Sequence, residues 1–277
     1  MIGQENIFLK FYKKVSMKVS IQAFSDSLLK RHAGLVHAFS PRNYGRKDGT
    51  AGELNFGSSG DEQILSHHKK WFLEAMGIEG CDVTRVTQVH GDRVYVLNDA
   101  SRSEAQVANV AADAIITSLV NRPIAVLTAD CIPVVVYDPE REVAGVVHAG
   151  RKGTSLNILS KTIGMMKRVY GCHPGDLVVA MGPGIGKCCY EVDAACMEPF
   201  ADNYPVWTKF AVQLPSGKYM LDLFSANMED ARKAGIGMQR ISRTSYCTSC
   251  DVDRFFSYRK EGPTGRMMTV AMLRAGG

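Results

Sequence analysis

Two histidines and one cysteine stand where apolar runs end, and these residue types either bind zinc or act as nucleophile and base. His90, Cys131 and His148 each close such a run, and small residues follow both histidines. We expect the three runs, at residues 86–90, 124–131 and 143–148, to be strands. Two imidazoles and one thiolate suit Zn²⁺, and three protein ligands leave the fourth position open, as catalytic zinc requires. The sequence therefore predicts a metal site of these three residues, with Zn²⁺ the expected ion and Cu²⁺ the alternative.

The same three residues fit a second chemistry without metal. Cys131 can be a nucleophile that one of the histidines activates as a base. A third interpretation is structural, since a buried cysteine is commonly a small apolar filler and a histidine at a strand end is commonly hydrogen-bonded. Spacing along the chain does not separate these interpretations. Asp113 and Asp130 can orient the histidines or transfer protons.

The glycine-rich run at residues 182–187 fails as a phosphate loop. A Walker A motif needs glycine where Met181 stands and serine or threonine where Cys188 stands. G-x-S-x-G and H-E-x-x-H are also absent from the sequence, which excludes the familiar serine hydrolases and zincins. A tight turn is the interpretation that remains for residues 182–187.

The pair Cys247 and Cys250 allows a redox dithiol or half of a zinc site. A four-thiolate site would borrow Cys188 and Cys189, but neighbouring cysteines seldom both bind one ion. A redox pair should open a helix, whereas residues 251–257 look like a strand. The sequence therefore favours structural thiols near a surface turn, outside the active site.

The composition is that of an ordinary globular protein. The 277 residues are 45% hydrophobic and 22% charged with a net charge of +5, which excludes a disordered or fibrous chain. No window approaches the roughly 20 apolar residues of a bilayer span. The chain also lacks the block of Lys and Arg residues that would indicate a nucleic-acid binder. Eight dispersed cysteines are not the framework of a small secreted domain, so a reducing, cytoplasmic location is expected.

The elements that must position these residues are short strands with interspersed helices. Periodicity and caps predict helices, and short apolar runs predict buried strands. Several strands are too close in sequence for helical crossovers, so the sheet must be mixed and the fold α+β. We expect one domain at residues 21–277 after a tail at residues 1–20. The predicted helices are 61–76, 155–170 and 222–234, and the predicted strands are 114–117, 124–128, 134–137, 143–147, 177–180 and 268–273.

At these motifs the chain resembles a known family from about Gly34 to Leu273. It is similar to the YfiH/YlmD proteins, which are also called laccase-domain or polyphenol-oxidase proteins and FAMIN-like purine nucleoside phosphorylases. The motifs are TQVHG at 87–91, DAIIT at 113–117, TADCIP at 128–133, HAG at 148–150, GPGIG at 182–186, FFSYR at 255–259 and TGR at 264–266.

The resemblance implies a layered α/β/β/α fold, shared with cysteine-hydrolase-like proteins, and a zinc site matching His90, Cys131 and His148. It implies phosphorolysis of adenosine, inosine and methylthioadenosine to the base and ribose 1-phosphate or its 5-methylthio analogue, with adenosine deaminase side activity. A copper laccase is disfavoured because multicopper oxidases need many histidines in H-x-H pairs, and this chain has seven histidines and no such pair.

Substrate roles follow from that implied activity. Arg42 is the candidate for phosphate, because a guanidinium matches its oxygens in bidentate fashion, with Arg259 and Arg266 as alternatives. Asn55 and Gln88 are candidates for the ribose hydroxyls or purine edges. Asp113 is a further candidate substrate-binding residue.

Cys131, His148 and Asp130 are the candidate catalytic residues. Arg151 stands where the family usually has tryptophan, which leaves the substrate preference open. The expected partners are a small-molecule nucleoside and phosphate, with no nucleic acid or membrane, for a monomer or small homo-oligomer. Two other functions stay open: a Cys–His hydrolase or amidase acting on a peptidoglycan precursor, and a non-enzymatic metal- or nucleoside-sensing module.

Overall fold

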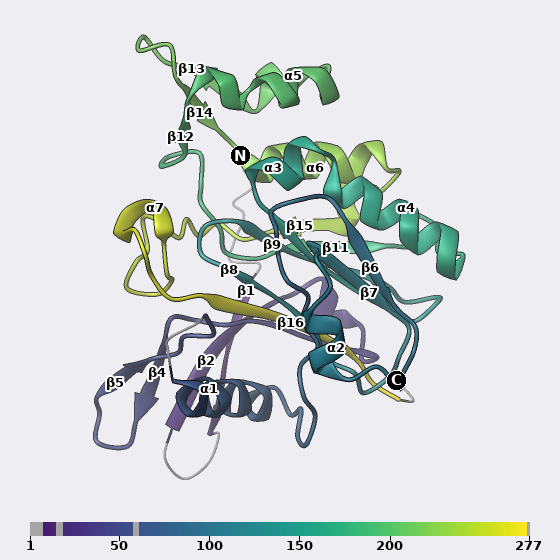
Figure 1. Ribbon diagram of the computed structural model, residues 1–277, viewed down its shortest axis with the longest axis vertical. Helices are drawn as coiled ribbons and strands as arrows, with labels where there is room; N and C mark the ends of the chain where they lie inside the picture. The colour runs from purple at the N-terminus through teal and green to yellow at the C-terminus, as the bar shows by residue number, and fades with distance from the viewer. Residues whose placement is uncertain (1–7, 15–18, 58–60, 276–277) are drawn as a thin grey trace.

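The computed structural model describes residues 8–14, 19–57 and 61–275. Two β-sheets lie face to face, and helices cover the outer face of each (Figure 1). This arrangement confirms the predicted α/β/β/α layers. Among the described residues, no helix combines the length and apolar character needed to cross a bilayer.

Within the described ranges the strands form three sheets, and the strands of each are named in their spatial order. The seven-stranded sheet contains β5 (Ala51–Glu53), β4 (Asn43–Arg46), β2 (Val19–Asp26), β3 (Leu35–Phe39), β16 (Met267–Leu273) and β8 (Ile124–Thr128), with β1 (Phe8–Lys14) paired to β2. The six-stranded sheet contains β15 (Ile241–Arg243), β11 (Val178–Met181), β9 (Ile132–Asp138), β10 (Val143–Ala149), β7 (Ala114–Thr117) and β6 (Val94–Leu97). The small sheet contains β12 (Glu191–Val192), β14 (Tyr219–Leu221) and β13 (Ala211–Gln213).

The helices lie mainly on the two outer faces (Figure 1). The α-helices are α1 (Glu62–Ala75), α2 (Glu104–Ala108), α3 (Arg151–Ser155), α4 (Ile158–Tyr170), α5 (Glu198–Asn203), α6 (Leu223–Lys233) and α7 (Tyr258–Glu261). Four short 3₁₀ segments in the described chain are η1 (Leu29–Arg31), η2 (Ala194–Cys196), η3 (Trp207–Lys209) and η4 (Met238–Arg240).

Three apolar clusters hold the layers together. The cluster between the sheets joins residues such as Val126 of β8 and Val135 of β9. On the outer face of the larger sheet, Phe72 of α1 belongs to a second cluster. On the outer face of the six-stranded sheet, Ile163 of α4 and Phe224 of α6 belong to the third. Burial of these faces, at roughly 25 cal/mol per Å² of apolar surface, is the main force that fixes the layers.

The crossing of the chain from one sheet to the other positions the candidate site residues. β8 lies in the larger sheet and β9 in the smaller of the two main sheets, so the chain crosses between them at residues 129–131. Asp130 makes the turn with a φ of 88°. β9 and β10 are antiparallel with His148 opposite Pro133, which brings the end of β10 beside Cys131. A sheet-to-sheet crossing and a strand end therefore meet at one point.

The predicted elements agree with the structure in kind and differ at several boundaries. The strands at 114–117 and 124–128 are confirmed, and the sheets are mixed as predicted. The helix predicted at 155–170 is wrong at its start, because Asn157 adopts a left-handed φ of 60° between α3 and α4.

Three other segments differ from expectation. Residues 86–90 form no strand and pair only through an isolated bridge between Thr87 and Ala111, and residues 251–257 form turns instead of a strand. In the predicted N-terminal tail, residues 8–14 pair with β2 as β1, while residues 1–7 and 15–18 lie outside the described residues.

A buried histidine next to β2 makes stability depend on pH. His37 Nε2 accepts a hydrogen bond of 2.9 Å from the Asp26 N–H, and burial lowers the pKa of His37 to about 4. The unfolded chain, with a histidine pKa of about 6.5, binds more protons between these values. The free energy of unfolding should therefore fall as the pH drops from about 6.5 to about 4, by at most about 3 kcal/mol from this group.

Chemical denaturation at a series of pH values checks this expectation. Burial raises the pKa of Asp26, which acts in the opposite direction, so the histidine contribution is the difference between the wild type and His37→Gln. An identical pH slope for both proteins would contradict the assignment to His37.

Candidate metal centre and adjoining pocket

The three predicted ligands come together in the structure. One donor atom each from His90, Cys131 and His148 lies within 4.8 Å of the others. The two imidazole rings are 4.7 Å apart between centroids at an angle of 81°. His148 and Cys131 are held by β10 and the sheet crossing, whereas exposed His90 sits on a loop with a left-handed φ of 58°. This donor set fits a Zn²⁺ ion with an open fourth position.

A buried carboxylate orients both histidines. Asp113 Oδ1 accepts a hydrogen bond of 2.8 Å from His148 Nδ1 and one of 2.9 Å from the His90 N–H, while Oδ2 accepts one of 2.6 Å from the Gly91 N–H. Burial favours the neutral acid, but the hydrogen bonds from His148 and the loop amides outweigh it and lower the pKa of Asp113. With Nδ1 bound to Asp113, Nε2 of His148 is left for Cys131 and a metal ion.

The histidines also favour the thiolate form of Cys131. Burial would raise the pKa of Cys131, but the charge and hydrogen bond of His148, together with His90, lower the pKa to about 6. Burial disfavours the imidazolium, yet Cys131 and Asp113 raise the pKa of His148 to about 9. A thiolate at neutral pH suits a metal ligand and a nucleophile alike.

A glycine makes the close approach at this centre feasible. A Cβ atom on Gly150 would lie 2.9 Å from Cys131 Sγ and 3.3 Å from His90 Cδ2. Any larger side chain here would push the ligands apart. The glycine that ends the HAG motif therefore has a packing role in the centre itself.

Asp130 lies at the pocket but acts mainly through its neighbours. Its Oδ1 accepts a hydrogen bond of 2.6 Å from Thr248 Oγ1, and its Oδ2 accepts one of 2.6 Å from the Arg259 N–H. Its backbone oxygen accepts another from the Ile185 N–H. Both carboxylate oxygens are thus engaged in holding the sheet crossing against two loops. A direct catalytic role for Asp130 stays a prediction.

The centre opens into a pocket of about 900 Å³, the size of a site for a small-molecule ligand. His90, Cys131 and His148 lie on its wall. Many of the other lining side chains are basic, which favours an anionic ligand. The basic lining residues are Arg85, Arg151, Lys152, Arg259 and Arg266.

Arg42, the predicted phosphate ligand, does not line this pocket. Its guanidinium pairs with Glu53 at 2.7 Å and Glu261 at 2.6 Å, and it stacks over the Phe256 ring at 4.7 Å. A third contact, to the Val252 carbonyl, occupies the same side chain. Arg42 is not among the pocket-lining residues and serves to join β4 to the segment before α7. Sequence spacing gave no sign of these acidic partners.

Asn55 and Gln88 use their amides on the protein backbone. Asn55 Oδ1 accepts hydrogen bonds from the Gly57 N–H at 2.8 Å and the Arg266 N–H at 2.9 Å, and Asn55 does not line the pocket. Gln88 does line it, but its side chain pairs with both the N–H and the carbonyl of Leu127, at 2.7 and 2.8 Å. Both side chains are therefore engaged with backbone groups, and ribose or purine binding by either residue stays a prediction.

Arg259 and Arg266, the alternative candidates for phosphate, both line the pocket. Arg259 Nη1 donates to the Glu191 carbonyl at 2.6 Å, and its guanidinium lies 4.9 Å from the centroid of the Tyr190 ring. Arg266 Nη1 donates to the Thr264 carbonyl at 2.7 Å. Each guanidinium is partly committed to the protein.

Sequence reasoning missed Arg85. This arginine lines the pocket, and its buried Nε has no hydrogen-bond partner among the described residues. Burial lowers the pKa of Arg85, although nearby Glu104 opposes this. A buried N–H donor without a partner is costly, and an anion in the pocket would relieve that cost. The only signal in the sequence is its place just before the TQVHG motif.

The chain matches known proteins over most of its length. Residues 36–274 match the family described as multi-copper polyphenol oxidoreductase laccase. A purine nucleoside phosphorylase of Xylella fastidiosa (strain 9a5c) is 31% identical over 239 residues, which are 86% of this chain and 87% of that protein.

Two solved structures share the fold. The hypothetical protein YfiH of Bacillus licheniformis superposes with a TM-score of 0.81 at 30% identity, covering 95% of this chain and 99% of that one. YlmD from Geobacillus stearothermophilus superposes with a TM-score of 0.83 at 25% identity, covering 98% and 100%. The family resemblance predicted from the motifs is therefore confirmed.

Proposed function

Because the chain belongs to the multi-copper polyphenol oxidoreductase laccase family, whose relative in Xylella fastidiosa is named a purine nucleoside phosphorylase, we propose that it is such an enzyme. The proposed substrates are adenosine, inosine or methylthioadenosine with phosphate, and the proposed metal is zinc. Deamination of adenosine is the proposed side activity. The proposed location is the cytoplasm, where the eight free thiols of the protein would stay reduced. The observation that carries the proposal is a His–Cys–His centre opening into a basic pocket.

The reaction transfers a ribosyl group to phosphate. An oxygen of HPO₄²⁻ bonds to C1′ of the ribose, the bond from C1′ to the purine nitrogen breaks, and its electron pair leaves with the purine. The proton of HPO₄²⁻ ends on the purine, so atoms and charge balance. When bound, Zn²⁺ supplies Lewis acidity at the open position of the centre.

The residues of this chain bind and orient the substrates. Arg85 is the proposed phosphate ligand, because its buried Nε lacks a partner within the described chain, and Arg151 and Lys152 add positive charge to the same pocket. Tyr258 is more than half exposed at the pocket and offers a ring face for the purine. Asp113 accepts a hydrogen bond from His148 Nδ1, which fixes the tautomer of His148 and the orientation of its ring toward the pocket.

Replacement of Arg85 tests the phosphate role. Arg85→Ala should raise the KM for phosphate about tenfold or more, since a charge-assisted hydrogen bond is worth about 1.5–3 kcal/mol. Arg42→Ala is the matched control, because that guanidinium is paired with two glutamates outside the pocket. It should lower stability with little change in the phosphate KM. The measurement is the rate of hypoxanthine release from inosine against phosphate concentration.

Two outcomes would overturn this assignment. A phosphate KM that rises in Arg42→Ala and stays constant in Arg85→Ala would exchange the two roles. Absence of ribose 1-phosphate among the products of the wild type would remove the phosphorylase itself.

The charge state of Cys131 supports a second candidate, a Cys–His hydrolase or amidase acting on a peptidoglycan precursor. His148 lowers the pKa of Cys131 to about 6, as a nucleophile would require. That enzyme would work without metal and would not need phosphate. Full activity on an amide substrate after removal of all metal would favour it over the phosphorylase.

A further inference from the structure

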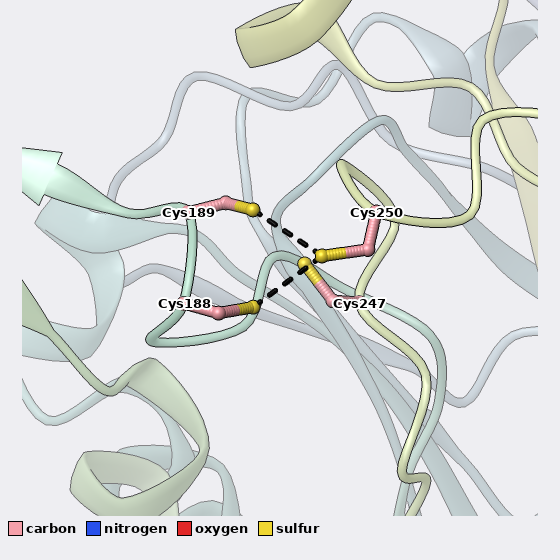
Figure 2. Close-up of side chains that lie close together, drawn as sticks. All are labelled: Cys188, Cys189, Cys247 and Cys250. Carbon is pink, nitrogen blue, oxygen red and sulfur yellow. Dashed lines mark hydrogen bonds between the residues drawn. The ribbon is translucent and has the colours of Figure 1, made fainter.

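Four cysteines gather outside the pocket, on two loops that are distant in sequence. Cys188 and Cys189 follow β11, and Cys247 and Cys250 lie between β15 and α7. Their four sulfur atoms all lie within 4.8 Å of one another. Figure 2 shows the side chains of Cys188 and Cys189 both directed toward Cys250, whose Sγ is 3.5 Å and 3.4 Å from theirs. The neighbouring cysteines Cys188 and Cys189 therefore converge with the other pair on one point.

The spacing of the sulfur atoms fits one bound ion better than disulfides. A disulfide requires sulfurs about 2.05 Å apart, and all four of these cysteines are free. Four thiolates around one tetrahedral Zn²⁺, at about 2.3 Å each, lie about 3.8 Å from one another. From this geometry we propose that Cys188, Cys189, Cys247 and Cys250 bind a structural zinc ion, separate from the His–Cys–His centre.

The loops are built to keep the four sulfurs close. Gly184 and Cys247 form an isolated parallel bridge, and the Thr248 N–H donates to the Gly184 carbonyl at 3.0 Å. The Gly186 N–H donates to Cys247 Sγ at 3.1 Å, which is the kind of outer contact that supports a metal-bound thiolate. A Cβ on Gly186 would lie 3.1 Å from Cys247 Cβ and 3.2 Å from Cys188 Sγ, so a larger residue here would require these cysteines to shift.

The donor set selects the ion. Thiolates are soft ligands that favour zinc over magnesium or calcium. An iron–sulfur cluster would hold its cysteines apart around several iron and sulfide atoms, whereas these sulfurs surround the space of one ion. Four protein ligands close the coordination sphere, so the ion would be structural and have no open position for substrate.

The proposed ion would fix one wall of the pocket. Tyr190, which lines the pocket, directly follows Cys189. Thr248, between the other two cysteines, donates its hydroxyl to Asp130 at the sheet crossing. Joining these two loops would therefore set the positions of Tyr190 and Asp130. This effect is structural and independent of which reaction the pocket performs.

Counting zinc in variants tests the proposal. The wild-type protein, purified without chelator, should hold about two equivalents of zinc by elemental analysis and by native mass spectrometry. Cys247→Ser/Cys250→Ser should hold about one equivalent less and unfold at a lower temperature, because a structural zinc site stabilises the fold directly. His90→Ala should also hold about one, since its cysteine cluster is intact. Cys81→Ser is the matched control and should keep both, because Cys81 lies outside both clusters.

Cobalt substitution separates the two sites. Thiolate-to-cobalt absorption in the wild type should fall strongly in Cys247→Ser/Cys250→Ser and only slightly in His90→Ala, because the tetrathiolate site holds four of the five thiolates in the two centres. His90→Ala keeps the test decisive where the double variant fails to fold. Complete loss of zinc from the His90→Ala protein would overturn the proposal. So would unchanged zinc in a folded double variant, iron with acid-labile sulfide in the wild type, or an intact mass that shows disulfides.

Discussion

Cys131→Ser is expected to lose the zinc of the His–Cys–His centre and nearly all phosphorolysis of inosine. A serine hydroxyl is neutral at pH 7 and harder than the thiolate that His148 stabilises, so it is a poor replacement ligand. Loss of outer partners of metal ligands alone costs roughly 10–100-fold, so loss of a ligand should cost about 100-fold or more in kcat/KM. Zinc content and initial rates on the same preparation measure both effects.

His90→Ala is the companion variant, because the metal and nucleophile interpretations differ at that residue. With a three-ligand site, removal of His90 should be as damaging as removal of Cys131. A Cys131→Ser protein that keeps its zinc, with an active His90→Ala, would instead support the nucleophile.

Alkylation adds a second measurement on the wild type. Iodoacetamide should modify Cys131 only after a chelator has removed the metal, read by peptide mass spectrometry at that residue. Rapid modification of Cys131 in untreated protein would contradict a metal-bound thiolate.

Asp113→Asn should give the second large effect. The asparagine side chain keeps one acceptor oxygen but loses the charge. Its NH₂ group would face an N–H donor of His148, His90 or Gly91 that now donates a hydrogen bond to Asp113, so that hydrogen bond would be lost. Zinc affinity and kcat should each fall about 10–100-fold. Competition with a chromophoric chelator gives the affinity, and steady-state kinetics separate kcat from KM.

Asp92→Asn is the control for that variant. Asp92 lies in the loop that carries His90 but makes an ion pair with Lys161 near the surface, and such pairs contribute about 0–1 kcal/mol. Its zinc affinity should match that of the wild type. An Asp113→Asn protein that binds zinc normally, or equal losses in both variants, would show that Asp113 does not act through the metal centre.

The candidate metal centre was predictable because its three residues lie in motifs that stand out in the chain. His148 lies near the end of β10 and Cys131 lies directly before β9, and the pairing of these two strands brings both residues together. The substrate residues were less predictable, because binding depends on which polar groups the fold leaves without partners. Arg42 has two glutamates that come from distant parts of the sequence, whereas Arg85 has a buried N–H with no partner in the described chain.

Backbone structure near the site was harder to predict for a similar reason. Residues 86–90 look like a strand, but Gln88 pairs its side-chain amide with the Leu127 backbone and takes the place of a ladder hydrogen bond. The predicted helix at 155–170 is interrupted at Asn157, where an asparagine tolerates the left-handed conformation. Neither feature changes the hydropathy of its segment, so periodicity does not reveal it.

The position of β16 has a consequence for biosynthesis. This strand lies between β3 and β8 in the larger sheet, although it is the last strand along the described chain. Until the ribosome has made residues 267–273, β3 and β8 lack the strand that joins them, and the face that supports the sheet crossing has a gap. Long-range pairing of this kind slows folding. The nascent chain therefore carries His90, Cys131 and His148 before the larger sheet can be completed.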